Sequence, residues 1–360
     1  MQALCLISGD HAAQLDHLAP LASLLAIPLY VTDPSVYDTA LLFYPFTTTI
    51  LIEDSSVLSL LGASDFVFVS CKHYSHELEK TLKFFYKKSP RFCYCPHGHS
   101  DKGWQNSTQD LLQNQDLSLV YGSSMLEQLK RQQVLDSLKG TFVTGNYRLL
   151  YYLKHRSFYD NLASNEIFGK IPTSSQKILY APTWQDGENN SSFFAIKDHL
   201  LQGLPKDAHL LIKLHPHLTK EPSFAVDLWL DTAKEHPNIH LIHHIPLVYP
   251  ILQHIDALLC DISSLGYDFL YFDKPLFLFR PPHVNSLHLP IVKLASCSAE
   301  FSAKNVLDLF SNFEKNLRWN QQAFASKRQK LYAETFDTSL TETTFSKTLL
   351  AYMQQKIYEL

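Results

Sequence analysis

Short runs of apolar, β-branched and aromatic residues alternate with helix-like segments, and this alternation limits the fold more than any other feature of the chain. In the N-terminal half the runs read ALCLIS, IPLYVT, TILIE, DFVFVS, RFCYC, LSLVYG and GTFVTG. Runs that are apolar throughout are typical of parallel strands covered on both faces by helices. The first half therefore predicts a doubly wound α/β domain.

The pattern starts again after the polar stretch 151–176. Its strand-like runs read KILYA, AHLLIKL, NIHLIHH, DALLCD and PLFLF. Amphipathic spacing between these runs predicts helices near residues 194–204, 225–235, 247–254 and 265–272. From residue 302 onward only helical spacing remains. The second half is thus a further α/β unit followed by C-terminal helices.

A length of 360 residues suits two domains. We expect Rossmann-like domains over 1–160 and 161–335, and a C-terminal helix over 336–360. In open α/β sheets ligands bind beyond the carboxyl ends of the strands. Two such sheets that face each other would hold a ligand in the cleft between them.

Composition narrows the classes of partner. Charged residues make up 18% and the net charge is −4, so the chain has no basic field of the kind that nucleic-acid binding needs. The longest apolar stretches, 18–31 and 57–69, fall short of a spanning helix. The N-terminus shows no secretion signal, and the six cysteines include no CxxC pair, so we expect reduced thiols and a cytoplasmic location.

A histidine follows the strand-like run RFCYC on the loop Pro96-His97-Gly98-His99. A histidine on a glycine-containing loop is accessible and titrates near neutral pH, so His97 is a candidate general base. Gly98 lets the backbone approach a ligand, and Lys102 follows on the same loop. The alternative is a purely structural role, in which His97 only caps the strand.

A zinc site is a third interpretation of this segment. Period-two spacing would place four metal-ligand types on one face if the strand continued, namely Cys93, Cys95, His97 and His99. Because Pro96 and Gly98 should end the strand, we expect no metal here.

A second pair of histidines follows the run LLIKL as His215-Pro216-His217. Pro216 forces the chain out of the strand and so presents an imidazole at the strand end. Either histidine could donate to a phosphoryl oxygen, and either could simply be a surface residue.

A serine pair follows the strand-like run that ends at Asp261. Ser263 and Ser264 stand where a helix should start, so their hydroxyls and the free backbone N–H groups suit a diphosphate. Serine is also an ordinary N-cap at such a position.

Two weaker signals follow other strands. Thr183 and Trp184 follow ILYA, where the indole could stack on a base or pack into the core. Arg148 follows FVTG, where it could bind an anion or a neighbouring acid.

Taken in order, these segments resemble the CDP-glycerol glycerophosphotransferase family, whose members build or prime teichoic-acid-type polymers. The resemblance covers about residues 91–279 and rests on the motifs PHGHSDKG, TGNYR, ILYAPTW, LIKLHPH and DISSLGYDFLYFDKP. It implies a GT-B fold and the transfer of glycerol phosphate or a related polyol phosphate from a CDP-linked donor.

The resemblance also implies roles for individual residues. His97 would deprotonate the acceptor hydroxyl, which attacks the β-phosphorus and expels CMP, while His215 would stabilise charge on the moving phosphoryl group. Ser263 and Ser264 would hold the donor phosphates. We expect further donor contacts from Thr183, Trp184, His217 and Asp261. We expect acceptor or phosphate contacts from Gly98, Lys102 and Arg148.

Such a transfer needs positioning and charge neutralisation, so we expect no cofactor and no metal. The family's loop usually continues His-Gly-Thr-Pro, whereas this chain has His99 and Ser100 after Gly98. From this departure we expect an altered acceptor side. A lipid-linked acceptor would bring the chain to the inner face of the membrane. Two alternatives stay open, a GT-B sugar-nucleotide glycosyltransferase or epimerase and a non-catalytic binding module of the same fold.

Overall fold

The computed structural model groups the chain into two compact units. Unit 1 comprises residues 1–99, 103–156 and 333–360, and unit 2 comprises 100–102 and 157–332. The sequence predicted ranges of 1–160, 161–335 and 336–360, and the contacts join the last segment to unit 1. The structure describes residues 1–70, 74–101, 115–184, 191–220, 224–242, 245–279 and 292–359.

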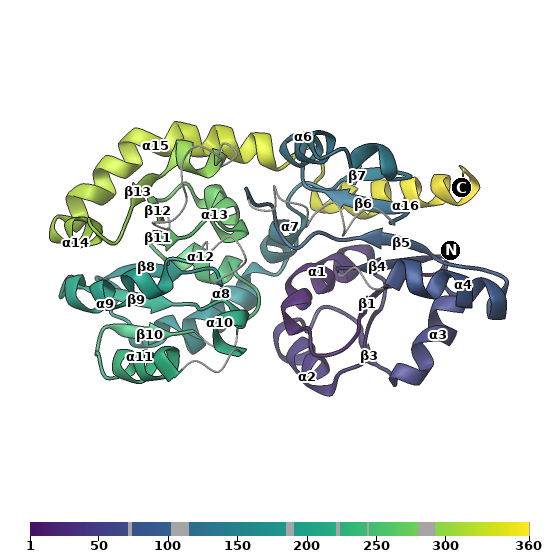
Figure 1. The fold of residues 1–360 in the computed structure, drawn as a ribbon, viewed down its shortest axis with the longest axis horizontal. Coiled ribbons are helices and arrows are strands. Elements are labelled where there is room, and N and C mark those ends of the chain that lie inside the picture. The colour runs from purple at the N-terminus through teal and green to yellow at the C-terminus, as the bar shows by residue number, and fades with distance from the viewer. Residues whose placement is uncertain are drawn as a thin grey trace. The chain divides into compact units, whose positions relative to one another are not determined.

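Unit 1 contains a seven-stranded sheet in the order β3-β2-β1-β4-β5-β6-β7, with every neighbouring pair parallel (Figure 1). Its strands are β1 Ala3–Ile7, β2 Leu29–Val31, β3 Thr49–Leu51, β4 Phe66–Val69, β5 Arg91–Tyr94, β6 Leu117–Val120 and β7 Thr141–Val143. They coincide with the predicted runs. All four residues of β4 are fully buried, and burial of one such side chain contributes about 1.5–3 kcal/mol.

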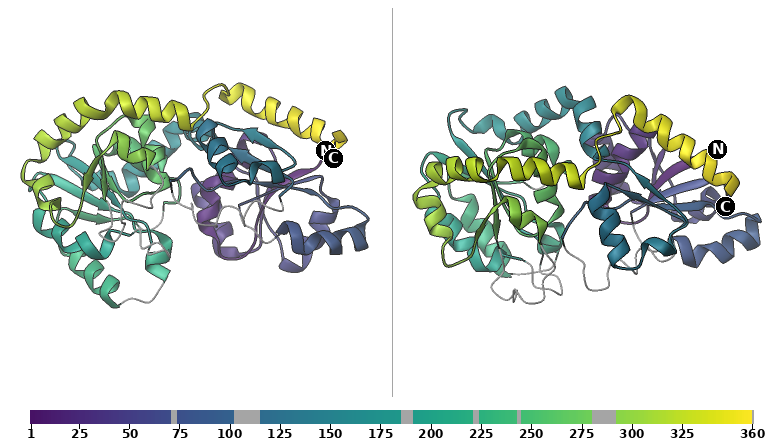
Figure 2. Two further views of the ribbon diagram at one scale, coloured as in Figure 1. Left: turned by 45° about the horizontal axis from the view of Figure 1, so that its top comes forward. Right: turned by 90° about the horizontal axis from the view of Figure 1, so that it is seen from above.

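Helices cover both faces of this sheet. They are α1 Leu15–Leu25, α2 Pro34–Phe43, α3 Asp54–Ala63, α4 Tyr74–Tyr86, α6 Ser123–Arg131, α7 Tyr147–Lys154 and α16 Glu342–Glu359, with short 3-10 turns η1 Ala12–Gln14 and η2 Leu135–Ser137. The C-terminal helix α16 lies along unit 1 (Figure 2). Its Tyr352 ring packs 5.2 Å from the ring of Phe142 in β7.

Unit 2 contains a six-stranded parallel sheet in the order β10-β9-β8-β11-β12-β13. Its strands are β8 Gln176–Ala181, β9 Ala208–Ile212, β10 Ile239–Leu241, β11 Ala257–Cys260, β12 Leu276–Phe279 and β13 Ala299–Phe301. The sequence missed β13. That strand is three residues long, lies at the edge of the sheet and contains the exposed Glu300, so it gives no apolar run.

The four helices predicted for unit 2 are present as α9 Phe193–Gly203, α11 Phe224–Lys234, α12 Tyr249–His254 and α13 Ser264–Phe269, and helical spacing after residue 302 corresponds to α14 Val306–Ser311 and α15 Phe313–Thr335. The sequence analysis missed α8 Arg156–Glu166 and α10 Pro216–Lys220. Short 3-10 turns complete the unit, namely η3 Phe168–Lys170, η4 Leu270–Phe272 and η5 Lys293–Cys297. Side chains of β8, β9 and β11 form the core with α9 and α11.

The strand orders fix where a ligand can bind in each unit. The order reverses between β1 and β4 in unit 1 and between β8 and β11 in unit 2. Connections leave in opposite directions at such a point, which opens a crevice beyond the carboxyl ends of the strands. The fold is the predicted GT-B type, with a doubly wound parallel sheet in each unit.

Candidate functional site

The His97 loop leaves the sheet directly after β5. The strand ends at Tyr94, as Pro96 predicted, so the period-two series that suggested zinc is interrupted before His97. His97 is exposed to solvent. Gly98 adopts a φ of 99°, a left-handed conformation that glycine accepts and other residues rarely do. Glycine here lets the chain turn so that the imidazole stays at the surface.

A buried tyrosine fixes this loop. The hydroxyl of Tyr121, the residue after β6, donates to the carbonyl of Pro96 at 2.6 Å and accepts the N–H of Gly98 at 3.1 Å. Tyr121 is 1% exposed. The backbone on either side of His97 is therefore tied to a core side chain, which restricts where the imidazole can lie.

The surroundings of His97 suit a base. Its Nδ1 lies 3.5 Å from the hydroxyl oxygen of Tyr94. In the tautomer whose Nδ1–H points to Tyr94, the Nε2 lone pair remains for a substrate proton. Surrounding protein lowers the pKa of His97, but because the residue is exposed we expect that lowering to be small.

Arg148 lies inside unit 1. It is 3% exposed and forms an ion pair with Asp16, a buried residue of α1. Its Nε also donates to the carbonyl of Asp16 at 3.1 Å. That carbonyl needs a partner because Pro20, one turn further along α1, has no N–H to donate. Of the two roles left open for Arg148, the structure shows the pairing with an acid.

The residue after Asp16, in the first turn of the same helix, is a histidine that the sequence analysis did not single out. His17 is 8% exposed, and its ring centroid lies 6.2 Å from that of His97 with an interplanar angle of 68°. Tyr147 donates to the carbonyl of His17 at 3.2 Å, and the same hydroxyl lies 2.9 Å from the sulfur of Cys95. The contacts fix His17 from α7 and from the end of β5.

The segment after His99 belongs to unit 2. Asp101 is 8% exposed and accepts hydrogen bonds from the Tyr267 hydroxyl at 2.6 Å and the Leu294 N–H at 3.1 Å. Burial raises the pKa of Asp101, and these hydrogen bonds oppose the rise. Tyr267 is part of α13, the helix that follows the serine pair. The predicted contact residue Lys102 lies outside the described residues.

In unit 2, Asp261 links the ends of two central strands. It is fully buried at the end of β11, and its Oδ2 accepts the N–H of Thr183, after β8, at 2.8 Å and that of Ser192 at 3.1 Å. These two hydrogen bonds fix the Asp261 carboxylate between the ends of β11 and β8, and the donor contact that the sequence suggested for this residue stays a prediction.

Three aromatic rings gather beyond β8 and β9. The ring centroid of Trp184 lies 5.0 Å from that of His217 and 6.3 Å from that of His215, and the two imidazoles stack at 5.3 Å. The His217 N–H donates to His215 Nδ1 at 3.2 Å. A neutral His215 therefore carries its proton on Nε2, where it is a donor suited to a phosphoryl oxygen.

The serine pair begins α13 as predicted, but Ser263 does not cap it. Ser263 has an extended backbone, and its hydroxyl is buried with no hydrogen-bond partner among the described residues. The helix is six residues long, so its dipole adds little. Any affinity for an anion would come from the hydroxyls and the first N–H groups of the helix.

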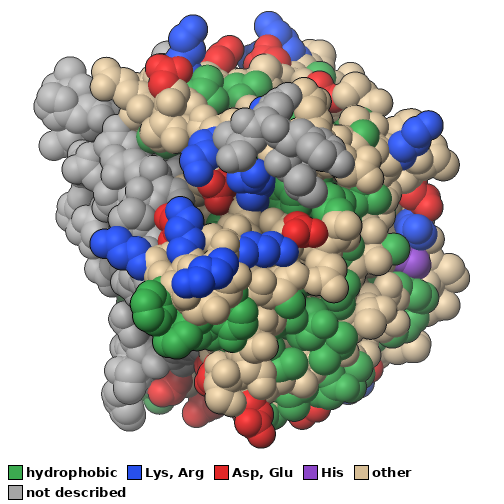
Figure 3. Space-filling view, turned by 90° about the vertical axis from the view of Figure 1, so that its right-hand side faces the viewer, with side chains coloured by type: hydrophobic (Ala, Val, Ile, Leu, Met, Phe, Trp, Pro, Cys, Tyr) green, Lys and Arg blue, Asp and Glu red, His purple; other side chains and the backbone are tan. Residues whose placement is uncertain are grey.

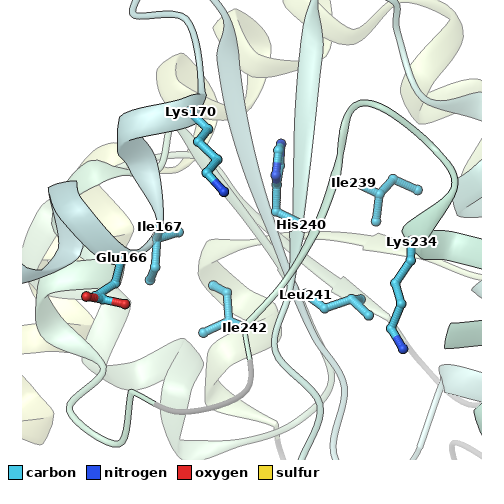
Figure 4. A pocket seen from close by; sticks show the side chains of 8 residues that line it. All are labelled: Glu166, Ile167, Lys170, Lys234, Ile239, His240, Leu241 and Ile242. Atoms are coloured by element: carbon cyan, nitrogen blue, oxygen red, sulfur yellow. The ribbon is translucent and has the colours of Figure 1, made fainter. Parts of the chain in front are cut away.

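A separate hollow of about 350 Å³ lies at the edge strand β10 of unit 2 (Figure 4). Glu166 and Lys170 line it from the α8 side and Lys234 from α11, and His240 lies on the strand itself. None of the predicted site residues lines this hollow. In the described ranges, no group of three or more His, Cys, Asp or Glu side chains is placed to hold a metal ion.

Sequence reasoning missed Tyr121, His17 and Asp16. One signal for α1 was available, because an adjacent Asp-His pair in an otherwise apolar helix is unusual unless the pair is buried with partners. No sequence pattern indicated the contact between Tyr121 and the His97 loop, because that contact depends on β5 and β6 being neighbours in the sheet.

Comparison with known proteins matches three of the sequence motifs to a family. Residues 151–283 match the sequence model of the family described as CDP-Glycerol:Poly(glycerophosphate) glycerophosphotransferase. This range includes ILYAPTW, LIKLHPH and DISSLGYDFLYFDKP. The loop of His97 and the segment of Arg148 precede it.

A curated relative supports the same family. The chain is 28% identical over 120 residues to a teichoic acid glycerol-phosphate primase of Bacillus spizizenii, a match that covers 32% of this chain and 29% of that protein. The chain thus matches less than a third of the relative's length.

Solved structures share the fold. A variant of the wall teichoic acid polymerase TagF superposes with a TM-score of 0.66 at 13% identity, over 100% of this chain and 89% of that chain. The UDP-GlcNAc 2-epimerase of Neisseria meningitidis gives 0.60 at 14% identity, over 99% and 100%. Residues 151–283 thus match the CDP-glycerol glycerophosphotransferase family model, and the whole chain has a GT-B fold.

Proposed function

We propose that the chain transfers glycerol phosphate, or a related polyol phosphate, from a CDP-linked donor to a hydroxyl acceptor and releases CMP. The observation that carries the proposal is the cluster at the switch point of unit 2. There the Asp261 carboxylate accepts the N–H of Thr183 at the ends of β11 and β8, and the Trp184 ring lies 5.0 Å from the His217 ring, tilted by 50°. The family match covers these residues.

The residues of this cluster suit the donor chemically. The indole of Trp184 and the imidazole of His217 offer flat faces to a base, and the Nε2–H of His215 can donate to a phosphoryl oxygen. Ser263 contributes a buried hydroxyl that has no partner among the described residues. Hydrogen-bond donors of the protein that are held in fixed positions stabilise the charge that develops during phosphoryl transfer.

Proton transfer is assigned to His97. The acceptor hydroxyl gives its proton to Nε2 of His97 as its oxygen forms a bond to the β-phosphorus. The bond between that phosphorus and the bridging oxygen breaks, and CMP leaves with the electron pair. A positioned base of this kind contributes about 10²–10⁴-fold to the rate.

Donor titration separates this proposal from the sugar-nucleotide alternative. Calorimetry with CDP-glycerol, CDP-ribitol and UDP-GlcNAc should show binding of a CDP-polyol and weaker binding of the UDP-sugar. Trp184→Ala should weaken binding of the preferred donor. Binding of UDP-GlcNAc alone would favour a glycosyltransferase or epimerase. The solved UDP-GlcNAc 2-epimerase shares only its fold with this chain.

The proposed reaction uses no resident cofactor. Imidazole and hydroxyl donors can neutralise the transferring group, so we expect turnover to persist after treatment with EDTA and dialysis. Loss of turnover that Mg²⁺ or Mn²⁺ restores would contradict this part of the proposal.

We propose that unit 1 can also contact a membrane surface through the end of α4. Phe84 and Phe85 are 69% and 66% exposed, and Lys87 Nζ lies 5.6 Å from the Phe84 ring centroid. Figure 3 shows hydrophobic side chains beside a group of Lys and Arg side chains on this side. Exposed aromatics next to lysines suit an anionic lipid surface. Among the described residues, no helix combines the length and apolar character needed to cross a bilayer.

Vesicle sedimentation tests this contact. The chain should sediment with vesicles rich in phosphatidylglycerol and less with phosphatidylcholine alone, and replacement of both Phe84 and Phe85 by Ser should abolish the difference. Exposed Leu307 on α14 provides a control, because Leu307→Ser removes an exposed apolar side chain elsewhere. Equal sedimentation of all three proteins would contradict the proposed contact.

A further inference from the structure

His17 occupies an unusual place beside the candidate base. It lies in the first turn of α1, 8% exposed, with its ring centroid 6.2 Å from that of His97. Its Nδ1 is buried and has no hydrogen-bond partner among the described residues. A buried polar atom without a partner costs about 1–3 kcal/mol, a cost that a leucine or phenylalanine at this position would not incur.

The surrounding chain holds His17 firmly. Two consecutive residues of α7 contact α1 at this point, because Tyr147 donates to the carbonyl of His17 and Arg148 pairs with Asp16. The titratable groups around the two imidazoles are thus Tyr147, the Asp16–Arg148 pair and Tyr94, which lies 3.5 Å from His97. Asp16 pairs with Arg148, and the guanidinium still acts on His17.

His17 stays uncharged at neutral pH. Burial lowers its pKa well below the ordinary value, and the Arg148 guanidinium and His97 lower it further. His17 therefore cannot take the acceptor's proton in place of His97. An uncharged imidazole can still fix the plane of a neighbouring ring and offer a polar nitrogen to a cation.

We propose that His17 is a positioning residue for His97: it holds the His97 ring in the orientation for proton transfer and is the polar neighbour of the imidazolium that forms there. This inference rests on the proposed function, in which the acceptor's proton moves to His97 as the new oxygen–phosphorus bond forms. It adds a residue of α1, outside the matched family region, to the acceptor side of the site.

Two substitutions separate polarity from packing. His17→Phe keeps a ring of similar size without nitrogen, and His17→Gln keeps a polar group without a ring. We expect His17→Phe to lower kcat about tenfold with the KM for CDP-glycerol unchanged, and His17→Gln to lower it less. The matched control is His155→Phe, which replaces another histidine of unit 1, stacked on Phe46 at 3.8 Å, and should leave kcat unchanged.

A measurement without substrate keeps the test independent of the proposed function. The pKa of the His97 imidazole, followed by NMR titration of the histidine ring signals, should fall in His17→Phe because the imidazolium loses its polar neighbour. It should stay at the wild-type value in His155→Phe. An unchanged His97 pKa in both His17 variants would overturn the inference and make His17 a packing residue, whatever donor the chain uses.

Discussion

Tyr121 bonds to the main chain on both sides of His97. Its hydroxyl donates to the carbonyl of Pro96 and accepts the N–H of Gly98, at 2.6 and 3.1 Å. Tyr121, a core residue at the end of β6, thus determines the backbone position of His97, an exposed residue after the neighbouring strand β5. The loop can be accessible to a substrate and still be rigid.

Tyr121→Phe removes both hydrogen bonds while it keeps the ring. We expect kcat to fall at least tenfold because the His97 ring loses its fixed position, and we expect the free energy of unfolding to fall by about 1–3 kcal/mol. Donor affinity should stay the same. Steady-state kinetics, calorimetry and urea denaturation measure these three quantities.

Tyr249→Phe is the matched control, since it removes a buried hydroxyl that donates to Asp268 at 2.7 Å in unit 2. It should cost stability without a comparable loss of kcat. If Tyr121→Phe lost stability but kept wild-type kcat, the bonds to the loop would have no part in positioning His97.

Ser263→Ala should separate ligand binding from helix capping. An ordinary N-cap serine contributes about 0.5–2 kcal/mol to stability, but the hydroxyl of Ser263 makes no capping bond. We therefore expect an unchanged free energy of unfolding and a raised Kd for CDP-glycerol, measured by denaturation and calorimetry.

Asp33→Ala gives the opposite outcome, because Asp33 accepts the N–H groups of Ser35 and Val36 at the start of α2. It should lose about 1 kcal/mol of stability with no change in donor affinity. Destabilisation by Ser263→Ala with unchanged donor affinity would assign Ser263 to the fold alone.

Arg148→Met should destabilise the chain strongly. The substitution leaves the Asp16 carboxylate buried without its cation, and loss of one member of a buried ion pair costs about 3–5 kcal/mol. Replacing both members, with Asp16→Leu and Arg148→Met, should restore part of that loss because no unpaired charge remains. Urea denaturation of the three variants gives the comparison, and equal losses in the single and double variants would contradict it.

The stability of the chain should fall in acid partly through His17. Its pKa in the folded chain lies well below the ordinary value of about 6.5, so below that pH the unfolded chain binds a proton that the folded chain does not. Stability therefore decreases as the pH is lowered through 6.5. His17→Gln should make the loss between pH 7.5 and 5.5 smaller by about 1 kcal/mol, measured by urea denaturation at both values. The same loss in both proteins would contradict the assigned charge state.

Much of the fold could be predicted from sequence because buried parallel strands leave a direct trace. Each residue of β4 is covered on both faces, so the strand is a continuous apolar run. The edge strand β13 leaves no such trace, since Glu300 points to solvent. At Pro20 the sequence gives a misleading signal, because proline normally interrupts a helix but α1 continues through this residue. Arg148 bonds to the carbonyl that Pro20 leaves free, and no local pattern reveals a partner so distant in the chain.

The site residues also fall into those that the local sequence reveals and those that only the fold reveals. His97, His215 and Ser263 each follow a strand, so their placement at strand ends followed from local sequence alone. Trp184 could be found but not assigned, since only the fold shows its ring beside that of His217. The buried state of Asp261 and the contact of Tyr121 with the His97 loop both depend on which strands are neighbours.

An acceptor-dependent transfer assay tests the central claim most directly. Purified chain is incubated with CDP-glycerol and a short glycerol phosphate oligomer carrying an alkyl chain, and CMP is measured against elongated acceptor. We expect one CMP per glycerol phosphate transferred, a loss of about 10²–10⁴-fold in His97→Ala, and wild-type turnover in His155→Phe, which changes a histidine that stacks on Phe46 elsewhere in unit 1. Wild-type turnover in His97→Ala, or binding of CDP-glycerol without any CMP release, would contradict the account, and the latter would indicate a non-catalytic binding module.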